Sequence, residues 1–146
     1  MAEVERIYYE SGELESEVFI LNGKMNGESK SYYKNGQIWT TCVYIDGKKQ
    51  GEYKQYDGTG QLEEICIYID DKKNGKQKWY YENGQLHQIY NCIDGIMNGE
   101  CKTYYENGQI EIECVYIDDK KNGKEKVYDE NGELIIESIW KNGEKK

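Results

Sequence analysis

Two groups of side chains in this sequence have chemistry that suits a metal ion or a nucleophilic reaction. Asp70-Asp71 and Asp118-Asp119 offer the carboxylate oxygens that hard cations prefer. Each pair is followed by two lysines, whose charge would repel a cation, and neither pair belongs to an alternating Asp-x-Asp loop. We therefore interpret these aspartates as solvated turn residues.

The second group is the one histidine and the cysteines that follow it. His87 with Cys92 and Cys101 has zinc-ligating atoms, but the sequence contains no Cys-x-x-Cys pair and no second histidine. His87 could act as a general base for Cys92 only if the two side chains were close. They are five residues apart on one expected strand, which places them on opposite faces of the sheet. The common phosphate-binding, dinucleotide-binding, hydrolase and zinc-protease motifs are also absent. We expect no enzymatic activity, no metal and no cofactor.

The organisation that positions these residues is a strict repeat. A tyrosine recurs every 24 residues without insertion or deletion, at Tyr8, Tyr32, Tyr56, Tyr80, Tyr104 and Tyr128. A fixed period of this length indicates a stack of one supersecondary unit.

Each repeat has the pattern of a β-hairpin. Residues 100–105 and 109–117 are rich in strand-forming side chains, and Glu106-Asn107-Gly108 lies between them. A two-residue turn would pair Tyr105 with Ile110, whereas a three-residue turn with a bulge at glycine would pair Tyr104 with Ile110. We favour the second pairing, because the first tyrosine is present in all six repeats and the second is replaced twice by aspartate.

This register separates two faces of the predicted sheet. The six repeating tyrosines form a structural ladder on the side that we expect to be buried. Trp79 and His87 become a cross-strand pair on the other side. That more variable side is our candidate protein-binding face, with Tyr33, Trp39, Tyr53, Trp79, Tyr81, His87, Ile89 and Tyr105. A candidate binding loop in the fourth repeat contains Ile96 and Met97, where most repeats have lysines.

Composition limits the classes of partner. The formal net charge is −9, which disfavours nucleic acid and anionic membrane surfaces and favours a basic protein. The sequence has no apolar run long enough to span a membrane and no signal-peptide pattern at its start. Cys42 and Cys66 occupy equivalent positions two strands apart, about 9–10 Å, which is too far for a disulfide. Reduced cysteines fit a cytoplasmic, intracellular location.

The predicted fold is all-β. It is an elongated antiparallel repeat of hairpins, a meander or solenoid of about 12 strands in the form of a rod or half-pipe. We expect a single repeat domain over residues 1–146, with repeats beginning at the six tyrosines. Residues 1–7 supply an N-terminal cap strand, and residues 128–146 form a truncated C-terminal repeat.

The repeating segments resemble a known family. Tyr80-Tyr81-Glu82-Asn83-Gly84-Gln85-Leu86 and its counterpart at 104–110 are each followed by a Tyr/Cys-Ile-Asp segment and an Asn-Gly pair. This pattern is similar to the variant MORN (membrane occupation and recognition nexus) repeat. The resemblance implies an antiparallel hairpin repeat without catalytic residues. It also implies scaffold, dimerisation or membrane-association roles, and an antitoxin role in bacterial toxin–antitoxin systems for variant members.

These observations predict a non-enzymatic protein-interaction or scaffold module. The alternatives that remain open are an antitoxin or immunity-type protein that neutralises a partner toxin, and a structural protein that self-assembles. A homodimer would form through sheet faces or edge strands.

Overall fold

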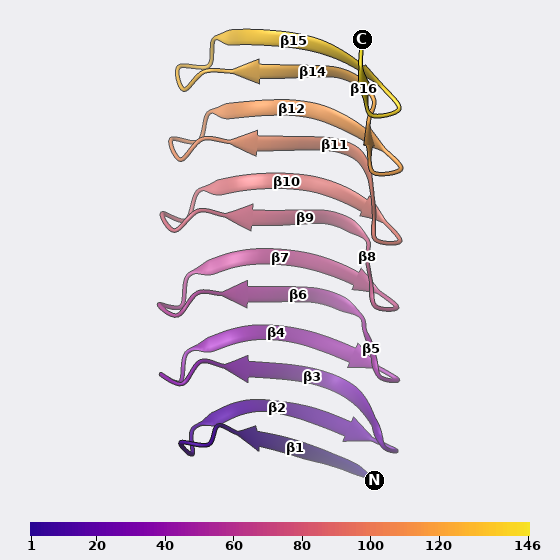
Figure 1. Cartoon of the computed structure of the whole chain (residues 1–146). Coiled ribbons are helices and arrows are strands. Elements are labelled where there is room, and N and C mark those ends of the chain that lie inside the picture. The colour runs from indigo at the N-terminus through magenta and orange to yellow at the C-terminus, as the bar shows by residue number, and fades with distance from the viewer. The chain divides into compact units, whose positions relative to one another are not determined.

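The computed structural model describes residues 1–146, and its only regular elements are β-strands (Figure 1). No helix is present that could cross a membrane. The chain divides into two compact units, Met1–Lys72 and Lys73–Lys146, which we call unit 1 and unit 2. In a repeat array each hairpin contacts only its neighbours, so this division does not test the one-domain prediction.

Unit 1 is an antiparallel meander in which the order along the sheet is β1, β2, β3, β4, β6, β7. The short strand β5 pairs with the end of β4. The strands are β1 (Ala2–Tyr8), β2 (Leu14–Leu21), β3 (Lys24–Tyr32), β4 (Ile38–Ile45), β5 (Lys48–Lys49), β6 (Gly51–Tyr56) and β7 (Leu62–Ile69), with β8 (Lys72–Lys73) at the boundary of the units.

Unit 2 repeats this arrangement in the order β9, β10, β11, β12, β14, β15, β16. The short strand β13 pairs with the end of β12. The strands are β9 (Gly75–Tyr80), β10 (Leu86–Ile93), β11 (Ile96–Tyr104), β12 (Ile110–Ile117), β13 (Lys120–Lys121), β14 (Gly123–Tyr128), β15 (Leu134–Lys141) and β16 (Glu144–Lys145).

The all-β prediction is confirmed, but the strand count is 16 rather than about 12. The four additional strands, β5, β8, β13 and β16, have two residues each, and the sequence pattern places them in loops. We call the segment that contains these short strands the return segment of each repeat. In the fourth repeat the return segment is continuous with the next strand. Ile96 and Met97 therefore begin strand β11, and the prediction that they form a loop is wrong.

The predicted register at the hairpin turns is confirmed. Tyr104 pairs with Ile110, and the other five repeating tyrosines pair with the equivalent Leu or Ile. The amide of Gly108 donates to the carbonyl of Tyr105 at 2.9 Å. Gly108 has a φ of 86°, the left-handed conformation that a three-residue turn with a glycine bulge requires.

Beyond the turn, each full hairpin contains a further β-bulge. In β10 the register shifts between Leu86 and Gln88, so that Trp79 pairs with Gln88. The predicted Trp79–His87 pair is therefore wrong. The bulge also moves Ile89 onto the face of the tyrosine ladder, opposite Lys78 and Lys102, and away from the other predicted binding residues.

The two faces of each sheet differ in burial. The more buried face carries Cys42 and Cys66 in unit 1 and Cys101 and Cys114 in unit 2, and we call it the cysteine face. The opposite face carries a repeating lysine, such as Lys54 or Lys102, and we call it the lysine face. Cys66 and Gln77 are fully buried on the cysteine face.

The six repeating tyrosines lie on the lysine face, because they alternate with the cysteine-face residues along their strands. Five of them are half-buried, and Tyr8 is exposed. The expectation that their face is the more buried one is wrong. A narrow row of small and medium side chains at the middle of the strands forms the core, because a single sheet layer has no second layer to cover large side chains.

Candidate functional site

The second tyrosine of the repeat pattern links consecutive hairpins. The hydroxyl of Tyr81 donates to the backbone carbonyl of Tyr104 at 2.7 Å, and that of Tyr105 donates to the carbonyl of Tyr128 at 2.8 Å. Tyr9 and Tyr33 make the equivalent bonds in unit 1. These rings are held against the hairpin turns, so each presents one fixed surface.

The asparagine of each Glu-Asn-Gly turn makes a parallel link. In unit 2, the Asn83 amide donates to the carbonyl of Glu106 at 3.1 Å, and the Asn107 amide donates to the carbonyl of Glu130 at 2.9 Å. Their Oδ1 atoms accept from the amides of Gln85 and Gln109 within the same turns. The three turns of unit 2 therefore form a row that is fixed both by tyrosines and by asparagines.

We call this row of turns, with Glu82, Glu106, Glu130, Tyr81 and Tyr105, the turn edge of unit 2. Two shallow hollows lie along it, of about 450 Å³ and 630 Å³. Tyr81 and Glu106 line both hollows. The three glutamates are exposed, and the structure gives their carboxylates no ion pair. The turn edge thus combines aromatic surface with unpaired negative charge.

The electrostatics of the two tyrosines reflect this setting. Burial raises the pKa of Tyr81, and Glu111 and Glu106 raise it further. Burial also raises the pKa of Tyr105, with added contributions from Glu111, Glu130 and Asp129. Both phenols are neutral hydrogen-bond donors at neutral pH.

Most of the predicted binding residues lie near turns or on the cysteine face. His87 stacks on Tyr81 with ring centroids 4.3 Å apart, and Trp39 contacts Tyr33 at 5.9 Å. Tyr53 packs edge to face on Tyr68 at 5.9 Å. The structure therefore brings Tyr81 and His87 together at the turn edge.

Other predicted residues are separated from it. Trp79 lies within strand β9, opposite Gln88, and Ile89 lies on the lysine face. Ile96 and Met97 are the first residues of β11, at the opposite end of the strand from the Glu-Asn-Gly turns. There the Met97 amide donates to Asp119 Oδ1 at 2.7 Å. His87 and Cys92 are near opposite ends of β10, so the histidine does not approach that thiol.

The aspartate pairs occupy tight turns. Asp118 and Asp119 have φ values of 50° and 62°, and Asp70 and Asp71 have similar ones. Asp71 Oδ1 accepts from the Lys49 amide at 2.7 Å, as Asp119 Oδ1 does from Met97. These carboxylates therefore link successive return segments within each unit. The structure contains no group of three or more His, Cys, Asp or Glu side chains placed to hold a metal ion.

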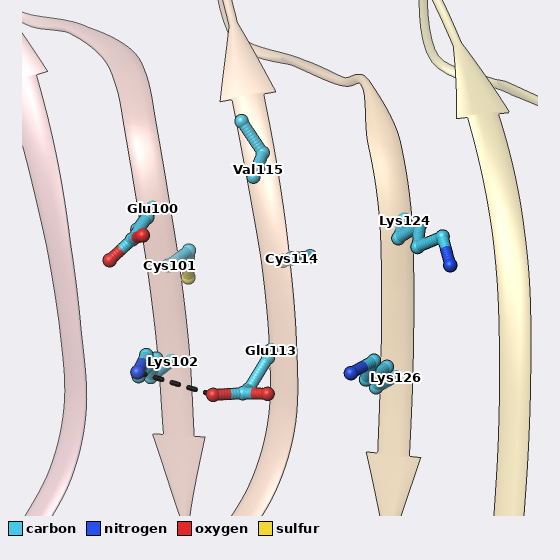
Figure 2. A pocket seen from close by; sticks show the side chains of 8 residues that line it. All are labelled: Glu100, Cys101, Lys102, Glu113, Cys114, Val115, Lys124 and Lys126. Carbon is cyan, nitrogen blue, oxygen red and sulfur yellow. Dashed lines mark ion pairs between the residues drawn. The ribbon is translucent and has the colours of Figure 1, made fainter.

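A third hollow, of about 260 Å³, lies on the lysine face of unit 2 (Figure 2). Lys102 and Glu113 form an ion pair across it at 3.2 Å, drawn as a dashed line. Although burial opposes the change, hydrogen bonds from Lys102 and Tyr128 lower the pKa of Glu113. Because these charges already have partners within the protein, this hollow is a weaker candidate than the turn edge.

Sequence reasoning did not find the three glutamates of the turn edge as a binding feature. Their signal was present, since Glu82, Glu106 and Glu130 recur at the 24-residue period. The sequence pattern predicts these glutamates only as turn residues. The sequence predicts Tyr81 and Tyr105 as contact residues but does not predict that they join the hairpins.

We expect Tyr81→Phe to lower the free energy of unfolding by about 0.5–1.5 kcal/mol, because it removes one hydrogen bond between hairpins while retaining the ring. Tyr104→Phe is the matched control, since the structure gives the Tyr104 hydroxyl no hydrogen bond. Urea unfolding followed by circular dichroism measures both variants. Equal stabilities for the two variants would contradict the linking role.

The fold and the linked turns define the class of this protein: a repeat protein of antiparallel β-hairpins. More particularly, it belongs to the family described as MORN repeat variant. The family model matches six segments, at residues 4–22, 25–46, 49–70, 73–91, 97–118 and 121–142. A comparison with curated proteins found no match.

Proposed function

We propose that this chain is a non-enzymatic protein-interaction module, and that the turn edge of unit 2 binds a basic segment of another protein. The observation that carries this proposal is the row of exposed, unpaired glutamates between fixed tyrosine rings. Lysine and arginine side chains suit such a surface, because carboxylates attract their charge and aromatic faces attract cations.

The spacing of the turn edge favours a particular conformation of the bound segment. Consecutive hairpins are two strands apart, about 9–10 Å at the usual strand spacing. A polyproline II helix brings every third residue to the same side, about 9.3 Å along its axis. A segment in this conformation with Lys or Arg at every third position would therefore place one cation at each glutamate.

The net charge supports the same class of partner. A formal net charge of −9 attracts a basic protein over a distance and raises its association rate at low salt. Neutralisation of a toxin is a narrower form of this proposal, in which the partner is a basic toxin and the bound chain covers its working surface.

The test is a titration of the whole chain with two fluorescent peptides of equal composition. One has arginine at every third position, and the other has the same residues in scrambled order. We expect the ordered peptide to bind more tightly, and we expect its affinity to fall with salt. Equal binding of both would overturn the spacing argument, and no binding of either would remove the turn edge as a basic-peptide site.

Self-association is a second candidate function, favoured by a separate observation. Strand β15 exposes a run of large apolar side chains, in which Leu134, Ile135, Ile136 and Ile139 are 44–58% exposed. Exposed apolar side chains along one strand favour association with another surface. Light scattering across protein concentrations measures this, and we expect the mass to rise with concentration. Ile135→Lys with Ile136→Lys should restore the monomer mass, whereas a constant monomer mass for the unmodified chain would exclude this function.

A further inference from the structure

Two cysteines in unit 2 lie directly opposite each other on adjacent strands. Cys101 of β11 and Cys114 of β12 are register partners, at the same level of the sheet (Figure 2). Directly opposed residues of an antiparallel pair have Cβ atoms about 4.5–5.5 Å apart, close to the 3.5–4.5 Å of a disulfide. A small adjustment of the two strands is enough to join the sulfur atoms.

The other three cysteines have different partners. Cys42 pairs with Ser29, Cys66 with Tyr53, and Cys92 with Gly75 and Met97. All five cysteines are buried, and none is part of a disulfide. The chain therefore contains one opposed dithiol and three further buried cysteines that serve as internal comparisons.

We propose that Cys101 and Cys114 form a redox-active dithiol, which small hydroperoxides convert to a reversible cross-strand disulfide. The two thiols are in contact, and the Gln88 amide donates to Cys101 Sγ at 3.7 Å. The ion pair of Lys121 and Glu125 lies beside them on the same face. Lys121 contributes positive charge at both sulfur atoms, and Glu125 contributes negative charge at Cys114.

These contacts assign different roles to the two sulfur atoms. Hydrogen bonds from the Cys114 thiol and the Gln88 amide, together with the charge of Lys121, lower the pKa of Cys101, while burial opposes this change. The hydrogen bond between the two thiols and burial raise the pKa of Cys114. Because Cys101 also accepts a hydrogen bond from the Gln88 amide, we assign Cys101 as the nucleophilic thiolate and Cys114 as the resolving thiol.

The reaction has two steps. The Cys101 thiolate attacks the terminal oxygen of the hydroperoxide, the O–O bond breaks, and Cys101 sulfenic acid forms with an alkoxide that takes up a proton. The sulfur of Cys114 then loses its proton and attacks Cys101 Sγ, and the S–O bond breaks to release water. The two thiols are oxidised to one disulfide, and the hydroperoxide is reduced to an alcohol and water.

Burial limits the size of the oxidant. Cys101 is 5% and Cys114 is 8% exposed. A small hydroperoxide reaches such thiols more readily than a bulky aromatic disulfide. The site therefore takes hydrogen peroxide or a small alkyl hydroperoxide.

The test treats the folded chain with hydrogen peroxide, blocks the remaining thiols after denaturation, and maps the cross-links by mass spectrometry. We expect a peptide joined through Cys101 and Cys114, loss of two hydrogens from the intact mass, and reversal by dithiothreitol. We expect three alkylated cysteines. A chain in which other cysteine pairs form at the same rate, or in which this pair stays reduced while a free thiol in the same tube is consumed, would overturn the proposal.

Variants test the roles of the two sulfurs. In Cys114→Ser, a sulfenic-acid probe should label Cys101 more than about tenfold faster than Cys42 or Cys66, because thiolate content governs reactivity. Cys42→Ser, the control, should still form the disulfide. Faster labelling of Cys114 in Cys101→Ser would reverse the assignment. The cross-link map of the unmodified chain needs no variant. It therefore tests the proposal even if Cys114→Ser or Cys101→Ser fails to fold.

Discussion

Glu125→Ala should lower the free energy of unfolding by about 2–4 kcal/mol, the largest effect that we expect from one substitution. Glu125 is 8% exposed, forms an ion pair with Lys121, and accepts a hydrogen bond from Trp140 Nε1 at 3.1 Å. The alanine variant leaves both donors without their acceptor. We place the effect below that of a fully buried pair, because the Lys121 side chain is 27% exposed and retains contact with water.

The sign of the pH dependence follows from Lys121. Although burial opposes the change, the hydrogen bond and charge of Glu125 raise the pKa of Lys121. A lysine with a raised pKa in the folded state contributes stability below its unfolded pKa, about 10.4, and that contribution is lost as the pH rises through the folded value. The full difference in the free energy of unfolding between the unmodified chain and Glu125→Ala should therefore be present at pH 7.

Two controls separate this effect from the loss of a carboxylate in general. Glu125→Gln keeps the shape and an acceptor for Trp140, so we expect a smaller loss than for alanine. Glu144→Ala removes an exposed ion pair with Lys146 and should change stability by less than about 0.5 kcal/mol. Urea unfolding at pH 7 measures all three variants. A loss below about 1 kcal/mol for Glu125→Ala would show that water replaces Glu125 as the partner of Lys121.

Glu125 illustrates what the sequence could not predict. The turn register was predictable, because Gly108 must adopt a positive φ and only one turn length leaves the repeating tyrosine opposite Ile110. Which face is buried was not predictable in the same way. A residue type that is present in every repeat suggests burial, but the repeating tyrosines lie on the less buried face. A single layer buries the middle of its strands, so a charged side chain at that position is buried with its partner.

The β-bulge accounts for most of the remaining differences. Without it, Cys101 would face Glu113, and with it Cys101 faces Cys114. The type of the extra residue at this position varies between hairpins, for example Glu111 in this hairpin and His87 in an earlier one. The bulge results from backbone geometry after the turn, which a pattern of residue types does not reveal. The dithiol is therefore visible only in the structure.

Parts of the candidate site could also not be predicted from the sequence. The turn register and the variability of their position predict Tyr81 and Tyr105 as contact residues, but not their hydrogen bonds. Their hydrogen bonds run to carbonyl groups 23 residues away, and such bonds depend on the distance between neighbouring turns. The glutamates between them form a surface only because these bonds and the asparagine amides align the turns.

Replacing Glu82, Glu106 and Glu130 together by lysine should weaken binding of the ordered arginine peptide by about 100-fold. Each exposed charge pair contributes about 0.2–1 kcal/mol, and reversal replaces each attraction with a repulsion of similar size. Three such changes give about 1–6 kcal/mol. The middle of this range, about 3 kcal/mol, corresponds to roughly 100-fold in Kd, since 1.4 kcal/mol is a tenfold change. The backbone carbonyls that accept from Asn83 and Asn107 are unaffected, so the turns should keep their alignment.

The matched control reverses three exposed glutamates elsewhere, Glu3, Glu5 and Glu144. It changes the net charge by the same amount, so it reports the contribution of long-range attraction alone. Fluorescence anisotropy at two salt concentrations measures Kd for both variants and the unmodified chain. We expect the control to lose less than about tenfold, with most of that loss removed by added salt. Equal losses in the two variants would show that the peptide responds to overall charge, and the turn edge would then have no special role in binding.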